Sequence, residues 1–352
     1  MSLEISKRDS NLDLVRSMAF FLVLAVHFLL NTGFYDTPSA GGRMLLGEIY
    51  RSFCLCCVPL FVMLSGYLQG EKVLSWRYYK GLLRILVTYL LASLVCMAYQ
   101  VGVQGAPLTV AWVLNQLATF QGAPYSWYVE MYCGLFLLIP FLNGMYQSLD
   151  TQKKRLALLL TLLLLSAAPT LILTQPMPDR WLNLWPITYY IMGRYLREYP
   201  LKFPAWGMGV LFLAIAVADG AFWYHLNGGL PHVWHPASDW GGLGVTAATL
   251  LMFSLLRRVR TDLAPPWVRR GLGEISRLSF AAYLISWIPD QVIYGVLNRA
   301  VPFMPDRFLY IPLTVGAAVL SSLVLAWFLE WAVQKILAQL NKIGALPAAY
   351  PK

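Results

Sequence analysis

Charged side chains are scarce in this sequence: Asp, Glu, Lys and Arg make up 12% of its 352 residues. A soluble protein of this length usually carries about a quarter charged residues, so the composition argues against a water-soluble fold. Hydrophobic residues make up 58% of the chain, and mean hydropathy is +0.58. These residues recur in blocks of about 20, the length that crosses a hydrocarbon core of about 30 Å. The composition therefore predicts an all-α polytopic membrane protein.

The apolar blocks predict about ten transmembrane helices. The first block has no small-residue cleavage site after it, so we expect no cleaved signal peptide. The segment 108–120 is too short to span and favours a re-entrant or interfacial piece. We expect one membrane domain over residues 1–352, with a motif-bearing core at about 11–335 and no soluble domain. The predicted spans are about 13–32, 49–69, 82–101, 127–147, 155–174, 183–198, 205–224, 240–256, 276–297 and 308–332.

Acidic residues are fewer than basic ones, 17 against 27, which gives a net charge of +10. Lys and Arg concentrate on the cytoplasmic side of membrane proteins. With the N-terminus placed inside, most basic residues fall on the cytoplasmic side, so we predict that both termini are cytoplasmic. This asymmetry accounts for the positive charge without a nucleic-acid partner. The basic residues left on the other side are Arg43, Arg51, Arg180, Arg299 and Arg307.

Metal-ligating residues are also few, with four His and five Cys. The cysteines lie within or beside apolar blocks, and the run CLCC at 54–57 lacks the partners of a zinc site. We interpret them as small residues at helix contacts, with palmitoylation or a redox role as the alternatives. The run HVWH at 232–235 has no further ligand in a defined element, so no metal site is predicted. The cysteines are Cys54, Cys56, Cys57, Cys96 and Cys133.

Three ionisable residues stand in the first predicted span: Asp13, Arg16 and His27. An ionisable group in hydrocarbon costs about 2.5–3.5 kcal/mol on insertion scales and is usually functional. Eleven residues of α-helix rise about 16 Å and turn a net ~20°, so Arg16 and His27 share one face. Asp13 is close enough to pair with Arg16, and we assign Asp13, Arg16 and His27 together to the catalytic site. One interpretation is an interfacial anchor and a packing histidine; the other is an entry for an anionic molecule, with His27 as general base.

The arrangement Asp-x2-Arg-x10-His resembles the signature of the acyltransferase-3 family of integral membrane acyltransferases. Several other segments resemble motifs of that family and follow in the same order, from about residue 11 to 290. They are VPLFVMLSGYL at 58–68, KGLLRILVTY at 80–89, SWYVEMYCGLFLLIPFL at 126–142, YYIMGRYL at 189–196 and ISRLSFAAYLIS at 275–286.

The resemblance implies transfer of an acyl group, usually acetyl, from cytoplasmic acyl-CoA to a sugar hydroxyl. The acceptor would be a cell-surface polysaccharide or its lipid-linked precursor, such as an exopolysaccharide or O-antigen. Acetyl-CoA would be a donor substrate rather than a permanently bound cofactor. The expected location is the bacterial inner membrane, with lipids, the glycan and other polysaccharide biosynthesis proteins as partners.

Two positions depart from the family pattern. Relatives often have a proline at the entry of the third span, where this chain has Val87 or Thr88. They also often end the YLI-type motif with histidine, where this chain has Ser286. The second departure bears on the acid–base partner of the reaction.

The donor site is predicted from basic and polar residues near the cytoplasmic face. Arg77, Lys80 and Arg84 follow helical spacing and, with Arg16, can surround the CoA phosphates. Positive-inside topology and lipid head groups explain the same residues without a ligand. Ser65 and Tyr67 are assigned to the same site by residue type, as possible donors to the oxyanion, although Ser65-Gly66 also suits a helix contact.

Four residues are predicted to meet the acceptor sugar: Glu130, Trp127, Tyr128 and Asp290. Glu130 and Asp290 are acids in apolar surroundings that can orient His27 or bind sugar hydroxyls. Helix capping or snorkelling are the alternatives for both.

Two other functions remain open at this point. Intramembrane charges and broken helices also suit a transporter of glycan or acyl groups, although no inverted repeat is evident. The substitution at Ser286 leaves room for a non-catalytic component of a polysaccharide export complex. For an enzyme, His27 either deprotonates the hydroxyl or carries the acyl group itself.

Overall fold

The computed structural model describes residues 9–171 and 179–342, and every regular element within them is a helix. The prediction of an all-α fold is confirmed for this part of the chain. The α-helices are α1 Ser10–Asn31, α2 Gly42–Cys54, α3 Cys57–Gln69, α4 Trp76–Tyr79, α5 Leu82–Gln104, α6 Val110–Ala118, α7 Trp127–Gln147, α8 Gln152–Ser166, α9 Trp185–Glu198, α10 Ala205–Asn227, α11 Leu243–Leu256, α12 Pro266–Ile285, α13 Trp287–Ala300, α14 Met304–Arg307 and α15 Ile311–Lys342. Short 3-10 helices are η1 Ala168–Leu171, η2 Asp179–Leu184, η3 Pro236–Ser238, η4 Thr261–Leu263 and η5 Phe308–Tyr310.

The number of spans differs from the predicted ten. Within the described residues, seven helical segments are long and apolar enough to cross a membrane, or eight if α12 and α13 form one bent span. The other two predicted spans, 155–174 and 183–198, contain α8 and α9, which have only 15 and 14 residues. That is shorter than the 17–25 residues of a typical spanning helix. Residues 172–174 lie outside the described part of the chain. Helix length therefore supports seven or eight spans.

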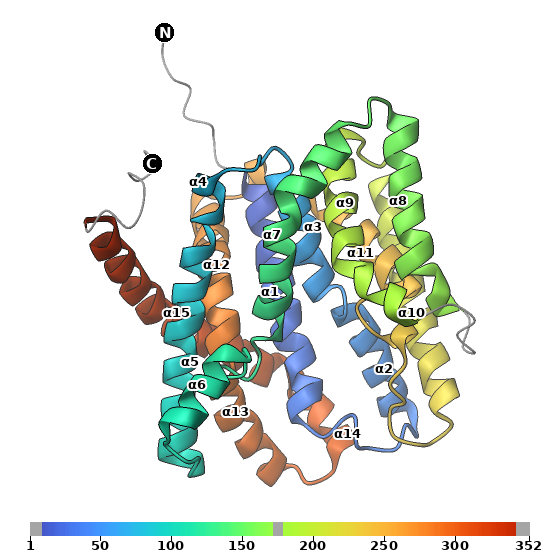
Figure 1. The fold of residues 1–352 in the computed structure, drawn as a ribbon. Helices are drawn as coiled ribbons and strands as arrows, with labels where there is room; N and C mark the ends of the chain where they lie inside the picture. The colour runs from blue at the N-terminus through green and yellow to red at the C-terminus, as the bar shows by residue number, and fades with distance from the viewer. Residues whose placement is uncertain (1–8, 172–178, 343–352) are drawn as a thin grey trace.

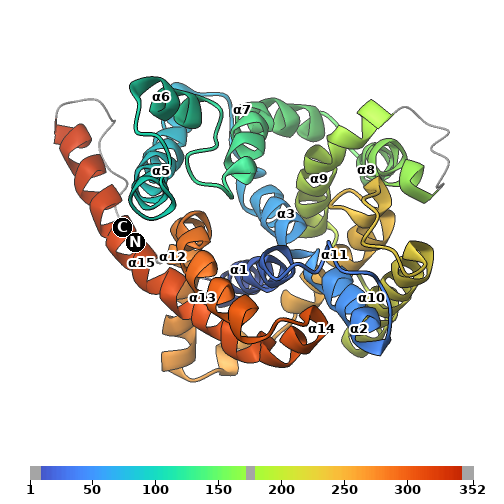
Figure 2. The ribbon, with the colours of Figure 1, turned by 90° about the horizontal axis from the view of Figure 1, so that it is seen from below.

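Helix α1 lies in the middle of the bundle, with α3, α11, α12, α13 and α15 around it (Figure 2). It begins at the same end of the bundle at which the long helix α15 finishes (Figure 1). This agrees with termini on one side of the membrane, and the identity of that side remains a prediction. The predicted short segment at 108–120 contains α6, nine residues long with no buried side chain, beside α5.

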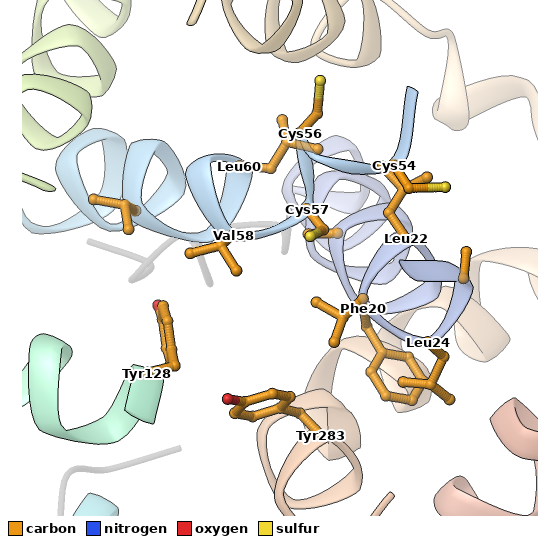
Figure 3. Packing of buried hydrophobic residues seen from close by; sticks show 14 of the residues in the cluster. Phe20, Leu22, Leu24, Cys54, Cys56, Cys57, Val58, Leu60, Tyr128 and Tyr283 are labelled. Atoms are coloured by element: carbon orange, nitrogen blue, oxygen red, sulfur yellow. The ribbon is translucent and has the colours of Figure 1, made fainter. Parts of the chain in front are cut away.

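The second predicted span is interrupted between α2 and α3, where the run CLCC lies. Cys54, Cys56 and Cys57 are all buried. Cys54 and Cys57 lie toward Leu22 and Phe20 of α1, whereas Cys56 points away from α1 (Figure 3). Burial raises the cost of a thiolate, so these cysteines act as small apolar residues. The three cysteines therefore lie at helix contacts, as the sequence suggested.

Helices α3 and α9 approach each other closely through two glycines. A Cβ on Gly66 would overlap the backbone carbonyl of Tyr190, and a Cβ on Gly193 would overlap the carbonyl of Met63. Small residues allow such close approach between membrane helices. Gly66 therefore lies at a helix contact, which is one of the two interpretations that the sequence offered for Ser65-Gly66.

Replacing Gly66 by alanine should destabilise the bundle, because the new methyl group meets backbone that cannot move aside. We expect Gly66→Ala to cost about 1–3 kcal/mol and to lower the thermal unfolding temperature in detergent. Gly134→Ala is the matched control, since a Cβ there meets nothing within 4 Å. Equal unfolding temperatures for the two variants would contradict the close contact.

Candidate functional site

His27 of α1 and Asp290 of α13 meet inside the bundle. The Nδ1 atom of His27 lies 3.1 Å from Oδ2 of Asp290, and the two residues are 7% and 0% exposed. A buried carboxylate beside an imidazole holds the ring in one orientation and favours the tautomer with the proton on Nδ1. In that tautomer Nε2 carries the free lone pair.

Two further side chains extend this pair into a network. The hydroxyl of Tyr125 donates to Oδ2 of Asp290 at 3.0 Å, and Asn31 donates to that hydroxyl at 2.8 Å. The Tyr125 ring also lies 3.9 Å from the His27 ring, centroid to centroid. Asp290 Oδ1 has no hydrogen-bond partner within the described residues. The network therefore holds the imidazole firmly while leaving one carboxylate oxygen free.

Asp290 reaches His27 because the ninth predicted span is broken. Helices α12 and α13 meet at 67° around Ser286. The Ser286 hydroxyl donates to the Tyr283 carbonyl at 2.9 Å, and the Asp290 amide donates to the Ser286 carbonyl at 3.0 Å. Pro289 is tolerated because the first turn of a helix needs no amide donor. Ser286, where relatives often have histidine, thus stabilises the break between the two helices. The residue that is hydrogen-bonded to the His27 ring is Asp290.

A cavity of about 410 Å³ lies beside this network, between α1, α3, α5, α7 and α12. That volume is within the usual range of ligand sites, about 300–1,000 Å³. Its walls include Arg16, Arg84 and Arg277 together with Tyr128, Tyr132 and Tyr283. Figure 3 shows the rings of Tyr128 and Tyr283 beside Val58, which also lines the cavity.

His27 itself does not line the cavity. Tyr283 does, and its ring centroid lies 6.4 Å from that of His27. The same ring meets Tyr128 edge-on at 6.0 Å. Tyr283 is therefore the side chain through which the cavity adjoins the buried histidine.

The three cavity arginines are each held by a polar partner. Arg16 donates to the Ser276 hydroxyl at 2.9 Å, and Arg277 pairs with Glu274 at 2.7 Å. Arg84 forms an ion pair with Glu330 of α15. A guanidinium has five donors, more than these ion pairs use at Arg84 and Arg277, so both can also bind an anionic ligand.

The residues predicted for the donor site separate into two groups. Arg16, Arg84 and Ser65 line the cavity, whereas Arg77 and Lys80 do not. Those two belong to the short helix α4 and its C-cap, ahead of α5, so they do not continue the face of Arg84. Tyr67 lies in a separate hollow of about 180 Å³, where its hydroxyl accepts from Arg257 at 3.0 Å.

The remaining predicted residues also differ in position. Tyr128 lines the cavity, and Trp127 stacks on Trp240 with ring centroids 5.8 Å apart. Glu130 is exposed in the first turn of α7, and Asp13 is buried on α1; neither lines the cavity. The catalytic role of Asp13 and the sugar-binding roles of Trp127 and Glu130 stay predictions.

Several residues of the site were not predicted, among them Asn31, Tyr125, Tyr283 and Arg277. Asn31 follows His27 by one helical turn, so its place on the same face could have been read from spacing. Tyr125 precedes α7 in a non-helical segment, where no periodicity indicates its direction. Tyr283 and Arg277 are on α12, and their approach to α1 depends on how the two helices pack.

These features define a class: a multi-pass helical membrane protein with a buried His–Asp pair next to an arginine-lined cavity. A family profile described as an acyltransferase domain, Acyl_transf_3, matches residues 9–330. The chain therefore belongs to the acyltransferase-3 family, as its motifs indicated. No similar curated protein and no similar solved structure was found.

The His27–Asp290 contact predicts a fixed tautomer of the imidazole. In Asp290→Asn the side-chain amide can donate to Nδ1, and we expect the proton to move to Nε2 in a large fraction of molecules. Nitrogen-15 NMR of histidine-labelled protein measures the two populations, with His27→Gln to assign the signal. An unchanged tautomer in Asp290→Asn would contradict the observed hydrogen bond.

Proposed function

We propose that this protein is a bacterial inner-membrane O-acyltransferase that moves an acyl group, acetyl in the simplest case, from cytoplasmic acyl-CoA to a sugar hydroxyl. The acceptor is a cell-surface polysaccharide or its lipid-linked precursor, an exopolysaccharide or O-antigen. The observation that carries the proposal is the buried His27–Asp290 pair beside an arginine-lined cavity, in a chain of an acyltransferase family.

His27 supplies the base that the reaction needs. A sugar hydroxyl is a weak nucleophile until its proton is removed, and Nε2 of His27 can take that proton while Asp290 stabilises the imidazolium. The hydroxyl oxygen then attacks the thioester carbonyl, the carbon–sulfur bond breaks, and the departing thiolate receives the proton from His27. The products are the sugar ester and free CoA.

A covalent route uses the same residues. Nε2 attacks the thioester carbonyl, the carbon–sulfur bond breaks, and CoA leaves as its thiolate. The sugar hydroxyl then attacks the acyl carbon, the carbon–nitrogen bond breaks, and the hydroxyl proton passes through Nε2 to the thiolate. Both routes need an imidazole held by Asp290 with Nε2 unprotonated. The Tyr125 and Asn31 hydrogen bonds support that requirement in either case.

The cavity suits the donor by charge and by position. Acyl-CoA carries several phosphate charges, and arginine binds phosphate with paired donors. Arg16 and His27 share one face of α1 and lie about 16 Å apart along the helix. A flexible thioester arm can bridge that separation. Phosphates held near Arg16, Arg84 and Arg277 would therefore place the thioester toward Tyr283 and His27.

Removing the base should abolish transfer without unfolding the protein. We expect His27→Ala to lower acylation by a factor of about 10²–10⁴, the usual contribution of a general base. The measurement is mass spectrometry of surface polysaccharide from cells with the gene deleted, restored, or restored as the variant. His225→Ala, an exposed histidine at the end of α10, is the matched control.

The two outcomes of that experiment separate the functions. Loss of an acyl-sized mass in the deletion strain and in His27→Ala, with His225→Ala intact, supports the enzyme. Unchanged acylation in His27→Ala, with lower polymer export in the deletion strain, contradicts it and favours the transporter or export component.

The cavity arginines should affect donor binding more than turnover. We expect Arg277→Gln to raise the KM for acyl-CoA about tenfold or more, because charged hydrogen bonds contribute about 1.5–3 kcal/mol each. The value of kcat at saturating donor should change little. Arg77→Gln, outside the cavity, serves as the control, and an equal KM for the two variants would contradict this donor site.

A further inference from the structure

A second group of buried polar side chains lies between α2, the end of α10 and the segment that follows α10. Its members, called here the Glu48–Arg51 cluster, are Glu48, Arg51, Asn227 and His232, with the rings of Tyr35 and Trp234 beside them. Glu48 and Arg51 are each 1% exposed. The cluster lies toward the end of the bundle away from the start of α1 (Figure 1).

One carboxylate oxygen of Glu48 and one terminal nitrogen of Arg51 make hydrogen bonds within the protein. Oε1 of Glu48 lies 3.0 Å from both Asn227 Nδ2 and His232 Nδ1, and it is 3.5 Å from the Ser39 hydroxyl. Arg51 donates through Nη2 to the Ser238 carbonyl at 2.7 Å. These bonds fix the orientation of both side chains.

The other carboxylate oxygen and the other terminal nitrogen make no hydrogen bond within the described residues. Oε2 of Glu48, Nη1 of Arg51 and Nε2 of His232 are buried and have no hydrogen-bond partner within the described residues. An unsatisfied buried polar group costs about 1–3 kcal/mol, and more when it is charged. Unsatisfied buried polar atoms of this kind call for an explanation, and a bound polar ligand is one that would supply the missing hydrogen bonds.

The character of the three atoms limits the ligand. A carboxylate oxygen accepts and a guanidinium nitrogen donates, so a simple anion would face Glu48 and a simple cation would face Arg51. No group of three or more His, Cys, Asp or Glu among the described residues has metal-binding geometry. A hydroxyl group both donates and accepts, and therefore satisfies both sides.

An aromatic surface adjoins the same cluster. The Trp234 ring is 62% exposed and stacks on Tyr35, with centroids 4.7 Å apart. Arg51 lies under both rings, 5.7 Å from Tyr35 and 5.6 Å from Trp234. An exposed aromatic face next to buried charged groups offers apolar contact for the C–H face of a pyranose and hydrogen bonds for its hydroxyls.

We infer that the Glu48–Arg51 cluster and Trp234 bind a neutral sugar residue of the acceptor glycan. The inference rests on the proposed function for the identity of that glycan, but the site is separate from the His27 network and from the donor cavity. It holds the acceptor through its hydroxyl groups at the end of the bundle away from Arg16.

The test is a binding measurement on the intact protein in lipid nanodiscs. The probe is a set of neutral oligosaccharides prepared by partial hydrolysis of the surface polysaccharide of the producing cells, followed by tryptophan fluorescence and saturation-transfer NMR. We expect Trp234→Ala and Glu48→Gln each to raise Kd about tenfold or more. The control is Trp206→Ala, which removes a tryptophan at the start of α10 that is 77% exposed, and this variant should bind as the wild type does.

Three results would overturn the inference. They are no oligosaccharide binding by the wild-type protein, equal binding by Trp234→Ala and wild type, or equal binding by Glu48→Gln with an unchanged unfolding temperature. The first of these would mean that the cluster holds ordered water only. Comparing the soluble oligosaccharide with a detergent extract of its lipid-linked form tells which form of the sugar binds more tightly.

Failure here is distinguishable from failure of the proposed function. The binding assay needs neither donor nor turnover, whereas acyl transfer is measured separately with wild type and His27→Ala. Transfer that depends on His27, in a protein that binds no oligosaccharide at this cluster, would refute the sugar site alone.

Discussion

The hydrogen bond between His27 and Asp290 is the interaction on which the rest of the site depends. Each group alone would be costly inside a membrane protein, and together they satisfy part of each other's hydrogen bonding. Their meeting requires that α1 pass through the middle of the bundle and that α12 and α13 be broken at Ser286. Tyr125 and Asn31 then complete the network from two further directions.

The molecule places different chemistry toward its two ends. The cavity with Arg16, Arg84 and Arg277 presents positive charge, suited to a phosphorylated donor. The Glu48–Arg51 cluster presents charges of both signs next to an exposed ring, suited to a neutral polyol. His27 stands on α1 beyond the cavity, so an acyl group and a hydroxyl arriving from opposite ends would meet there.

Much of this was readable from the sequence, because membrane helices follow hydropathy and because ionisable groups within them are rare. The helical fold follows from hydropathy, and the shared face of Arg16 and His27 follows from helical spacing. Arg84 was assigned by spacing and Ser65 by residue type, and both line the cavity. Asp290 was singled out as an acid in an apolar segment, but its contact with His27 depends on the 67° break. The positions of Tyr67, Arg77 and Lys80 were less predictable, because a short helix ahead of α5 and a contact with Arg257 decide them. The predicted count of ten spans is not confirmed, because the described helices α8 and α9 are short.

The most direct test of the account is a structure of the protein in lipid with a non-hydrolysable acyl-CoA analogue. The account predicts phosphate density next to Arg16, Arg84 and Arg277, and the acyl carbon on the far side of the cavity, next to Tyr283 and His27. Phosphates bound instead in the hollow with Tyr67 and Arg257, or an acyl carbon remote from His27, would contradict it.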